Sequence, residues 1–158
     1  MLLEGSFTIA APRERVAEFF SRVDNIARVI PGCVEHRAED ADQVIMVIEQ
    51  KVAWLKGRFT VTMRVVENKL PDEITSQADG RDSLTGSSLK IVNNLRLEEP
   101  APGETTIRYR MEVSVFGKLG SLGFFAIKAK AQALEQEFIV ATRAVLESLA
   151  ESAEGSVV

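Results

Sequence analysis

The stretch VFGKLGSLGFFAIKAKA, residues 115–131, marks the point at which the pattern of apolar residues changes. Before Phe116, apolar and polar side chains alternate as in strands with one buried face. After Ser121, apolar residues recur every three or four positions, as in an amphipathic helix. The stripe of this helix consists of Ile127, Ala131, Leu134, Phe138, Ala141, Val145 and Leu149. The pattern predicts one long C-terminal helix that packs on a sheet.

Alternating runs also fill the chain from Cys33 to Phe116 and predict about six consecutive antiparallel strands. After a first run at Cys33, they are residues 44–54, 58–67, 73–80, 88–97 and 105–116. Segments rich in Asp, Pro and Gly separate the runs, as expected for turns. The strict alternation in several runs predicts a sheet with one buried face and one solvated face.

The N-terminal part adds a strand over residues 2–10 and two short helices, the first after Pro12 and the second ending near Ile30. A twisted sheet covered by one long helix curls around that helix. The sequence therefore predicts an α+β helix-grip fold: a curved antiparallel sheet of about seven strands around the C-terminal helix. One domain is expected over residues 1–150, followed by a short flexible tail at residues 151–158.

Composition and charge limit which kinds of molecule the protein can bind and where in the cell it is expected. The formal net charge is −4 with scattered Lys and Arg, which argues against nucleic-acid binding. No apolar run approaches the roughly 20 residues of a membrane span, and the N-terminus does not resemble a signal peptide. A single Cys33 allows no internal disulfide. We expect a cytoplasmic protein, with peripheral contact to the inner face of the membrane.

Four motifs carry a family resemblance: GSFTIAAPRERV at residues 5–16, VIPGC at 29–33, KVAWLKGRF at 51–59 and VFGKLGSLGFF at 115–125. Together they resemble the CoxG family of carbon monoxide dehydrogenase proteins, within the START, polyketide cyclase and Bet v 1-like (SRPBCC) superfamily. One departure is visible, because Ala53 and Trp54 stand where the family pattern leads us to expect Gly-Pro.

The resemblance implies an accessory protein that works beside molybdenum-flavin dehydrogenase subunits, with membrane recruitment and quinone carriage as its tasks. Many family members carry a long C-terminal extension that ends in an apolar anchor. This sequence stops shortly after its helix, so no permanent anchor is expected.

Catalytic and metal-binding patterns are weak. Cys33 and His36 are three residues apart, which in a regular strand sends their side chains to opposite faces, so we interpret them as core and surface residues. Glu39, Asp40 and Asp42 are interpreted as turn residues. We expect no catalytic residues, no metal and no covalently attached cofactor.

Polar residues within apolar strand faces are more informative. Gln50, Asn93 and Tyr109 fall on the buried side of their strands, where each needs a partner in the protein, in ordered water or in a ligand. A helix-grip arch can enclose an apolar pocket. The family resemblance implies that this pocket binds a quinone or another isoprenoid lipid. The predicted cavity residues are Met46, Gln50, Trp54, Phe59, Met63, Asn93, Tyr109, Leu122, Phe124, Phe125 and Phe138.

The glycines of the opening stretch suggest a gate. Gly117, Gly120 and Gly123 weaken the start of the helix, so that Leu122 and the two following phenylalanines can move aside. The predicted membrane contacts are Lys118, Leu119, Lys128 and Lys130.

The leading hypothesis is a non-catalytic carrier of a hydrophobic small molecule. Two alternatives stay open: a polyketide cyclase or dehydratase in which a buried polar group polarises a carbonyl, and an assembly factor whose cavity is collapsed. Ile139 and Leu146 lie off the main helical stripe and hint at a dimer contact.

Overall fold

The helices and strands follow the predicted order in a computed structural model, which describes the backbone of residues 1–155 and the side chains of residues 1–148. The order is β1 (Leu2–Ile9), α1 (Arg13–Phe20), α2 (Val23–Val29), β2 (Cys33–Ala38), β3 (Gln43–Val52), β4 (Leu55–Lys69), β5 (Glu73–Asp82), β6 (Ser88–Ala101), β7 (Glu104–Phe116), the 3-10 helix η1 (Gly120–Leu122) and α3 (Phe124–Gly155). The long helix runs past residue 150, and residues 156–158 of the predicted tail lie outside the described residues.

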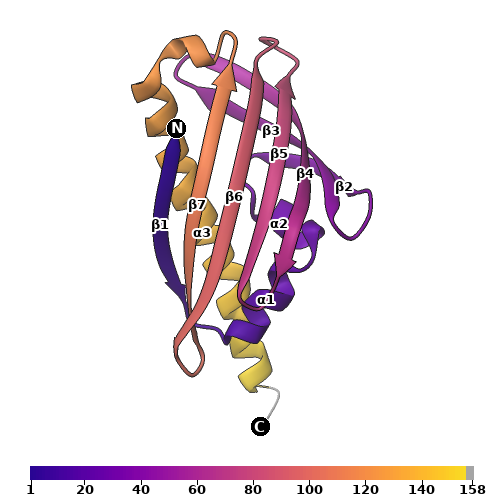
Figure 1. The fold of residues 1–158 in the computed structure, drawn as a ribbon, viewed down its shortest axis with the longest axis vertical. Helices are drawn as coiled ribbons and strands as arrows, with labels where there is room; N and C mark the ends of the chain where they lie inside the picture. Colours follow the sequence, from indigo (N-terminus) through magenta and orange to yellow (C-terminus); the bar gives the residue numbers. More distant parts are fainter. Residues whose placement is uncertain (156–158) are drawn as a thin grey trace.

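The strands form one seven-stranded sheet in the order β1-β7-β6-β5-β4-β3-β2, and every neighbouring pair is antiparallel. Figure 1 shows the curved sheet with α3 running along one face and α1 and α2 beside the C-terminal part of α3. The long central strands twist strongly, and an irregularity between Val65 and Glu67 bends β4 further. The predicted helix-grip α+β fold is confirmed.

Two clusters make up the core. One joins α1, the end of α2, β1, the middle of the sheet and the C-terminal half of α3, and it includes the fully buried Phe20, Ile107 and Leu146. The other joins α2, β3, β4 and the η1 region, and it includes Val44 and Leu119. The fold is therefore packed most tightly where the short helices meet the sheet.

The C-terminal half of α3 docks with a different face from the one predicted. Leu146 is 0% exposed and Ile139 is buried, whereas the predicted stripe residue Val145 is 37% exposed. The hint of a dimer contact at Ile139 and Leu146 was wrong, because both pack in the core. Phe138, which also belongs to the predicted stripe, is only half-buried. The side chain of Leu149 lies outside the described residues.

Charged residues lie on the convex face of the sheet, which points away from α3, as the strand alternation predicted. Arg58 pairs with Glu49 across β3 and β4, and the Nε of Arg108 lies 2.9 Å from Oε1 of Glu98. Exposed pairs of this kind contribute little stability each. The opposite, concave face of the sheet is mainly apolar, as strand alternation requires.

Candidate functional site

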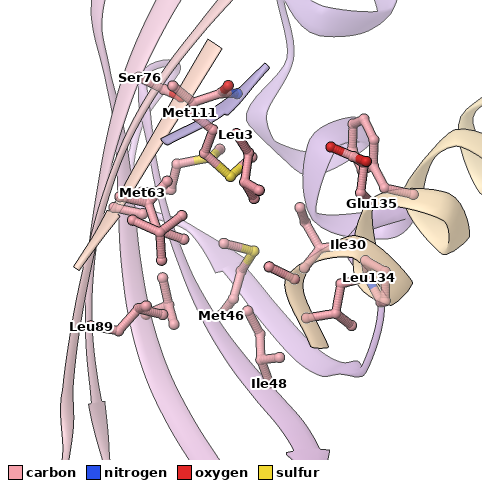
Figure 2. Close-up of a pocket in the computed structure, with 18 of the residues that line it drawn as sticks. Leu3, Ile30, Met46, Ile48, Met63, Ser76, Leu89, Met111, Leu134 and Glu135 are labelled. Atoms are coloured by element: carbon pink, nitrogen blue, oxygen red, sulfur yellow. The ribbon is translucent and has the colours of Figure 1, made fainter. Parts of the chain in front are cut away.

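A cavity of about 320 Å³ lies between the concave face of the sheet and the N-terminal half of α3. Its wall comes from all three helices, from β1 and β3 to β7, and from Leu119. Figure 2 shows the side chains of Met46, Met63 and Met111 at this cavity, with Leu134 and Glu135 of α3 on the opposite side. The wall is almost entirely apolar, as in pockets that bind hydrophobic small molecules. No side chain of α3 before Ile139 is fully buried, because the helix stands off the sheet here.

Seven of the predicted cavity residues line this space. They are Met46, Gln50, Phe59, Met63, Asn93, Tyr109 and Phe138. Strand alternation was sufficient to place those on the sheet, because side chains two residues apart share a face. The thioether side chains adapt their shape readily, which suits a pocket for a flexible apolar ligand.

Four predicted cavity residues lie elsewhere. Trp54 is 74% exposed and Phe125 is 84% exposed, Phe124 is also exposed, and Leu122 packs against the second core cluster without lining the cavity. Trp54 is exposed because it sits at the tip of the two-residue turn between β3 and β4. Ala53 before it has a φ of 53°, the left-handed conformation that favours glycine, which explains the glycine expected there from the family pattern.

Of the four predicted membrane contacts, two are exposed and two line the cavity. Lys118 and Lys128 are exposed, and the Lys128 ammonium lies 5.6 Å from the centre of the Phe124 ring. Leu119 is instead buried and lines the cavity, and the half-buried Lys130 lines it too. The assignment of Leu119 to the membrane surface was therefore wrong, because η1 folds back and directs this side chain inward.

The three glycines before α3 have a structural reason that needs no motion. Gly117 and Gly123 have φ values of 89° and 96°, which disfavour any residue with a side chain. A Cβ on Gly120 would lie 2.5 Å from the carbonyl oxygen of Val115. Substitution by alanine would therefore strain the backbone at all three positions. The gate is still a proposal, and its test requires substitutions at residues other than these glycines.

A hydrogen-bond chain ties this closing segment to the turn between β5 and β6. The Leu119 N–H donates to Ser87 Oγ at 2.9 Å, and Ser87 Oγ lies 2.7 Å from Thr85 Oγ1. The Thr85 hydroxyl in turn donates to the buried Asp82 carboxylate. Burial opposes ionisation of Asp82, but the hydrogen bonds from Thr85 and from the backbone N–H groups of Arg58, Leu84 and Thr85 outweigh it, so the pKa of Asp82 is lowered.

We expect Asp82→Asn to destabilise the protein by about 2 kcal/mol at neutral pH, because hydrogen bonds to a buried charge are lost. Since the pKa of Asp82 is lower in the folded state than in the unfolded state, its contribution is present above about pH 4 and is lost as pH falls through the folded pKa. Urea unfolding of the variant from pH 7 to pH 3 should therefore show a shallower acid loss than the wild type. Asp79→Asn, at an exposed carboxyl on the same strand, is the control. Parallel curves for Asp82→Asn and the wild type would contradict this assignment.

Two polar groups of the cavity wall stand out. The Asn93 Oδ1 is buried and has no hydrogen-bond partner within the described residues. The Tyr109 hydroxyl lies over Gly5 of β1, where a Cβ would collide with it. Burial, together with the interaction with the Glu135 carboxylate, raises the pKa of Tyr109 well above its ordinary value. Tyr109 is thus a neutral hydrogen-bonding group and a poor base.

Sequence reasoning missed Glu135 and Ser76, which both line the cavity. Glu135 lies four residues after Ala131, so its helical spacing was the available signal. Ser76 shares strand parity with Ala78 in a run whose alternation is weak. Small and charged residues do not stand out as cavity residues until the fold places them.

The prediction that the side chains of Cys33 and His36 point to opposite faces of their strand is wrong. A bulge between Cys33 and Glu35 changes the register of β2, so that Cys33 lies opposite Ile48 and His36 opposite Met46. The two side chains therefore share a face. Burial nevertheless raises the pKa of the Cys33 thiol, and the Nε2 of His36 lies 3.8 Å from an Asp24 carboxylate oxygen. Among the described residues, no three His, Cys, Asp or Glu side chains gather closely enough to hold a metal ion.

One end of the fold gathers exposed apolar side chains and positive charge. Three segments meet there in Figure 1: the β3–β4 turn, the β5–β6 turn, and the end of β7 with the start of α3. The exposed apolar residues of this end are Trp54, Leu84, Phe116, Phe124 and Phe125. Residues 51–58, 81–90 and 116–130 contain eight Lys or Arg, of which Arg58 pairs with Glu49, and one acidic residue, the buried Asp82, although the whole chain carries a net negative charge. We call this surface the basic-aromatic end.

Comparison with known proteins identifies the family. Residues 5–147 match the family model of CoxG, a subunit of carbon monoxide dehydrogenase. The chain belongs to the CoxG family. The match covers most of β1, all of β2 to β7 and most of α3, and it confirms the resemblance carried by the four sequence motifs. No curated protein sequence matches the chain significantly.

Solved structures similar to this CoxG-family chain share its fold. A conserved protein from Geobacillus kaustophilus has a TM-score of 0.85 at 17% identity, with 94% of this chain and 96% of that chain covered. A START superfamily protein from Mycobacterium smegmatis has a TM-score of 0.70 at 15% identity, with 94% and 98% covered. The Zhui aromatase/cyclase from a Streptomyces species has a TM-score of 0.67 at 14% identity, with 93% of each chain covered.

Proposed function

We propose that this CoxG-family protein is a non-catalytic carrier that binds a lipid quinone in its cavity and serves a molybdenum-flavin dehydrogenase of the carbon monoxide dehydrogenase type. The observation that carries the proposal is the apolar cavity of about 320 Å³ under α3. Family membership supports the choice of partner. The proposal needs no covalently attached cofactor, because the carried molecule supplies the redox chemistry.

An open cavity favours a carrier over an assembly factor without a ligand. A core that served only stability would be expected to fill this space, since cavities cost stability in proportion to their size. The helix instead stands off the sheet along Ile127, Ala131 and Leu134, and these side chains line a cavity. A molecule that fills the space and brings its own apolar surface would recover the lost contacts.

We further propose that the basic-aromatic end docks on an anionic membrane surface. Exposed aromatic side chains bury apolar area at the headgroup boundary, and each nearby Lys adds about 1 kcal/mol on an anionic surface. Leu119 and Ile127 line the cavity from this same end of the fold. Movement of this segment would join the cavity to the lipid, so that a quinone passes between them without crossing water. Within the part of the chain that the structure describes, none of the helices is long and apolar enough to cross a membrane.

We expect Trp54→Ser to weaken binding to vesicles that contain anionic lipid by about tenfold, because the exposed indole loses its apolar contact with the interface. The same variant should slow transfer of a fluorescent quinone analogue from these vesicles to the protein, measured by stopped flow. Val140→Ser, at an exposed apolar residue in the middle of α3, is the matched control. Equal transfer rates for wild type, Trp54→Ser and Val140→Ser would place membrane exchange at another surface.

A cyclase or dehydratase is the second candidate, because Tyr109 and Asn93 could polarise a carbonyl group inside the cavity. The raised pKa of Tyr109 makes its hydroxyl a hydrogen-bond donor rather than a base. A carrier returns its ligand unchanged, so mass spectrometry of a quinone or polyketide probe after incubation separates the two functions. Conversion of either probe would favour the enzyme.

A further inference from the structure

Polar residues line the cavity on several elements, with Gln50 on β3 and Lys130 on α3, and three of them lie on the neighbouring strands β5, β6 and β7. Asn93 lies directly opposite Ser76 on β5 and Met111 on β7, and Tyr109 lies opposite Leu95, two residues further along the same face of β6. Asn93 and Tyr109 are therefore diagonal neighbours on one wall. Glu135 reaches the same cavity from α3 and interacts with the Tyr109 hydroxyl. Asn93, Tyr109 and Glu135 thus form a polar cluster in a cavity that is lined mainly by apolar residues.

Within the described residues, the buried polar atom of this cluster that lacks a partner is an acceptor. The Glu135 carboxylate only accepts, and the Tyr109 hydroxyl is the donor that faces it. The Asn93 Oδ1 is an acceptor that has no partner among the described residues. Leaving such a group unpaired in a buried site costs free energy, so the site favours a ligand that brings donors.

We propose that Asn93, Tyr109 and Glu135 form a head-group subsite that binds the hydroquinone form of the carried molecule more tightly than the quinone form. This inference rests on the proposed carrier function and adds the redox state that the cavity prefers. A hydroquinone ring carries two hydroxyl donors, which can pair with the Glu135 carboxylate and the Asn93 Oδ1. A quinone ring offers only carbonyl acceptors, which can pair with neither the Glu135 carboxylate nor the Asn93 Oδ1.

The preference has a consequence for the bound redox couple. When the reduced form binds more tightly, the midpoint potential of the bound couple lies above that of the free couple. A tenfold preference corresponds to a rise of about 30 mV for this two-electron couple. The dehydrogenase would then reduce a carrier-bound quinone more favourably than a free one, and the carrier would hold the reduced product for delivery.

The test compares 2-decyl-1,4-benzoquinone with its hydroquinone, measured by anaerobic equilibrium dialysis against the wild-type protein. The expected result is at least tenfold tighter binding of the hydroquinone. In Glu135→Gln, which keeps the shape but adds an amide donor, the preference should fall below about threefold. Glu137→Gln, an exposed glutamate on the same helix, should keep the wild-type preference. Equal affinities in the wild type, or an unchanged preference in Glu135→Gln, would overturn the subsite while leaving the carrier function standing.

A second variant tests the same subsite through the unpartnered amide. Asn93→Leu should raise the thermal midpoint of the ligand-free protein, because it removes the unpaired polar atom, and should weaken hydroquinone binding by about tenfold. Binding of decylbenzene, a probe of similar shape without a polar head, should not weaken. A lower midpoint, or equal losses for hydroquinone and decylbenzene, would mean that Asn93 has only a packing role. If the wild-type protein binds none of the three probes (the quinone, the hydroquinone and decylbenzene), both the subsite and the carrier function are overturned.

Discussion

Replacing Ala131 with Phe is expected to weaken quinone binding by about 5- to 150-fold while the protein remains folded. Ala131 lines the cavity from α3, so a phenyl ring at this position occupies space that the ligand needs. Seating the ligand beside the added ring requires overpacking that costs about 1–3 kcal/mol. Equilibrium transfer of a fluorescent quinone analogue from vesicles to the protein measures the effect.

The matched control is Ala133→Phe, two residues along the same helix at an exposed position. It adds the same ring to solvent and should leave binding unchanged. Vesicle docking should be normal in both variants, because the basic-aromatic end is untouched. Wild-type binding by a folded Ala131→Phe protein would show that the quinone occupies a different site.

The second large effect concerns the anchoring of α3. Leu146→Ala should destabilise the protein by about 3 kcal/mol, since deletion of a fully buried leucine side chain leaves a cavity in the first core cluster. Val145→Ala, at the adjacent and partly exposed position, should cost less than about 1 kcal/mol. Chemical denaturation of the two variants compares the true helix face with the one that the sequence pattern predicted. A larger loss in Val145→Ala would contradict the docking of α3 through Leu146.

Periodicity was sufficient to predict the arrangement of the fold. The alternating runs became β3 to β7 with small differences at their ends, because strands of this length need one apolar face to pack. The change of period around Gly117 correctly located the start of α3. The pattern was less reliable along the second half of α3, where the contact face turns from Phe138 toward Ile139 and Leu146. A helix that crosses a twisted sheet presents a different side at each end, and one sequence stripe cannot represent that change.

The site was predictable only in part, for three physical reasons. Strand parity placed Met46 and Asn93 in the cavity, but it failed at Cys33, where a bulge reverses it. Hydrophobicity alone placed Trp54 inside, whereas its position at a hairpin tip makes it exposed. Glu135 was missed because a charged helical residue is normally expected to face solvent.

The residue types alone do not show whether a cavity stays open between α3 and the sheet. The same Met and Phe side chains can fill a core or line a pocket, depending on how far the helix stands from the sheet. In this chain Ile139 and Leu146 anchor one half of α3, and the other half is held off the sheet around an open cavity. The proposed function depends on this division of α3 into a half that packs in the core and a half that lines the cavity.

The most direct test of the carrier function is to extract the purified, natively expressed protein with organic solvent and analyse the extract by mass spectrometry. We predict a lipid quinone or its hydroquinone in an amount comparable to the protein, and a strongly reduced amount from Ala131→Phe prepared in parallel. An extract without any isoprenoid quinone, from a wild-type protein that also fails to take up added quinone from vesicles, would contradict the carrier function.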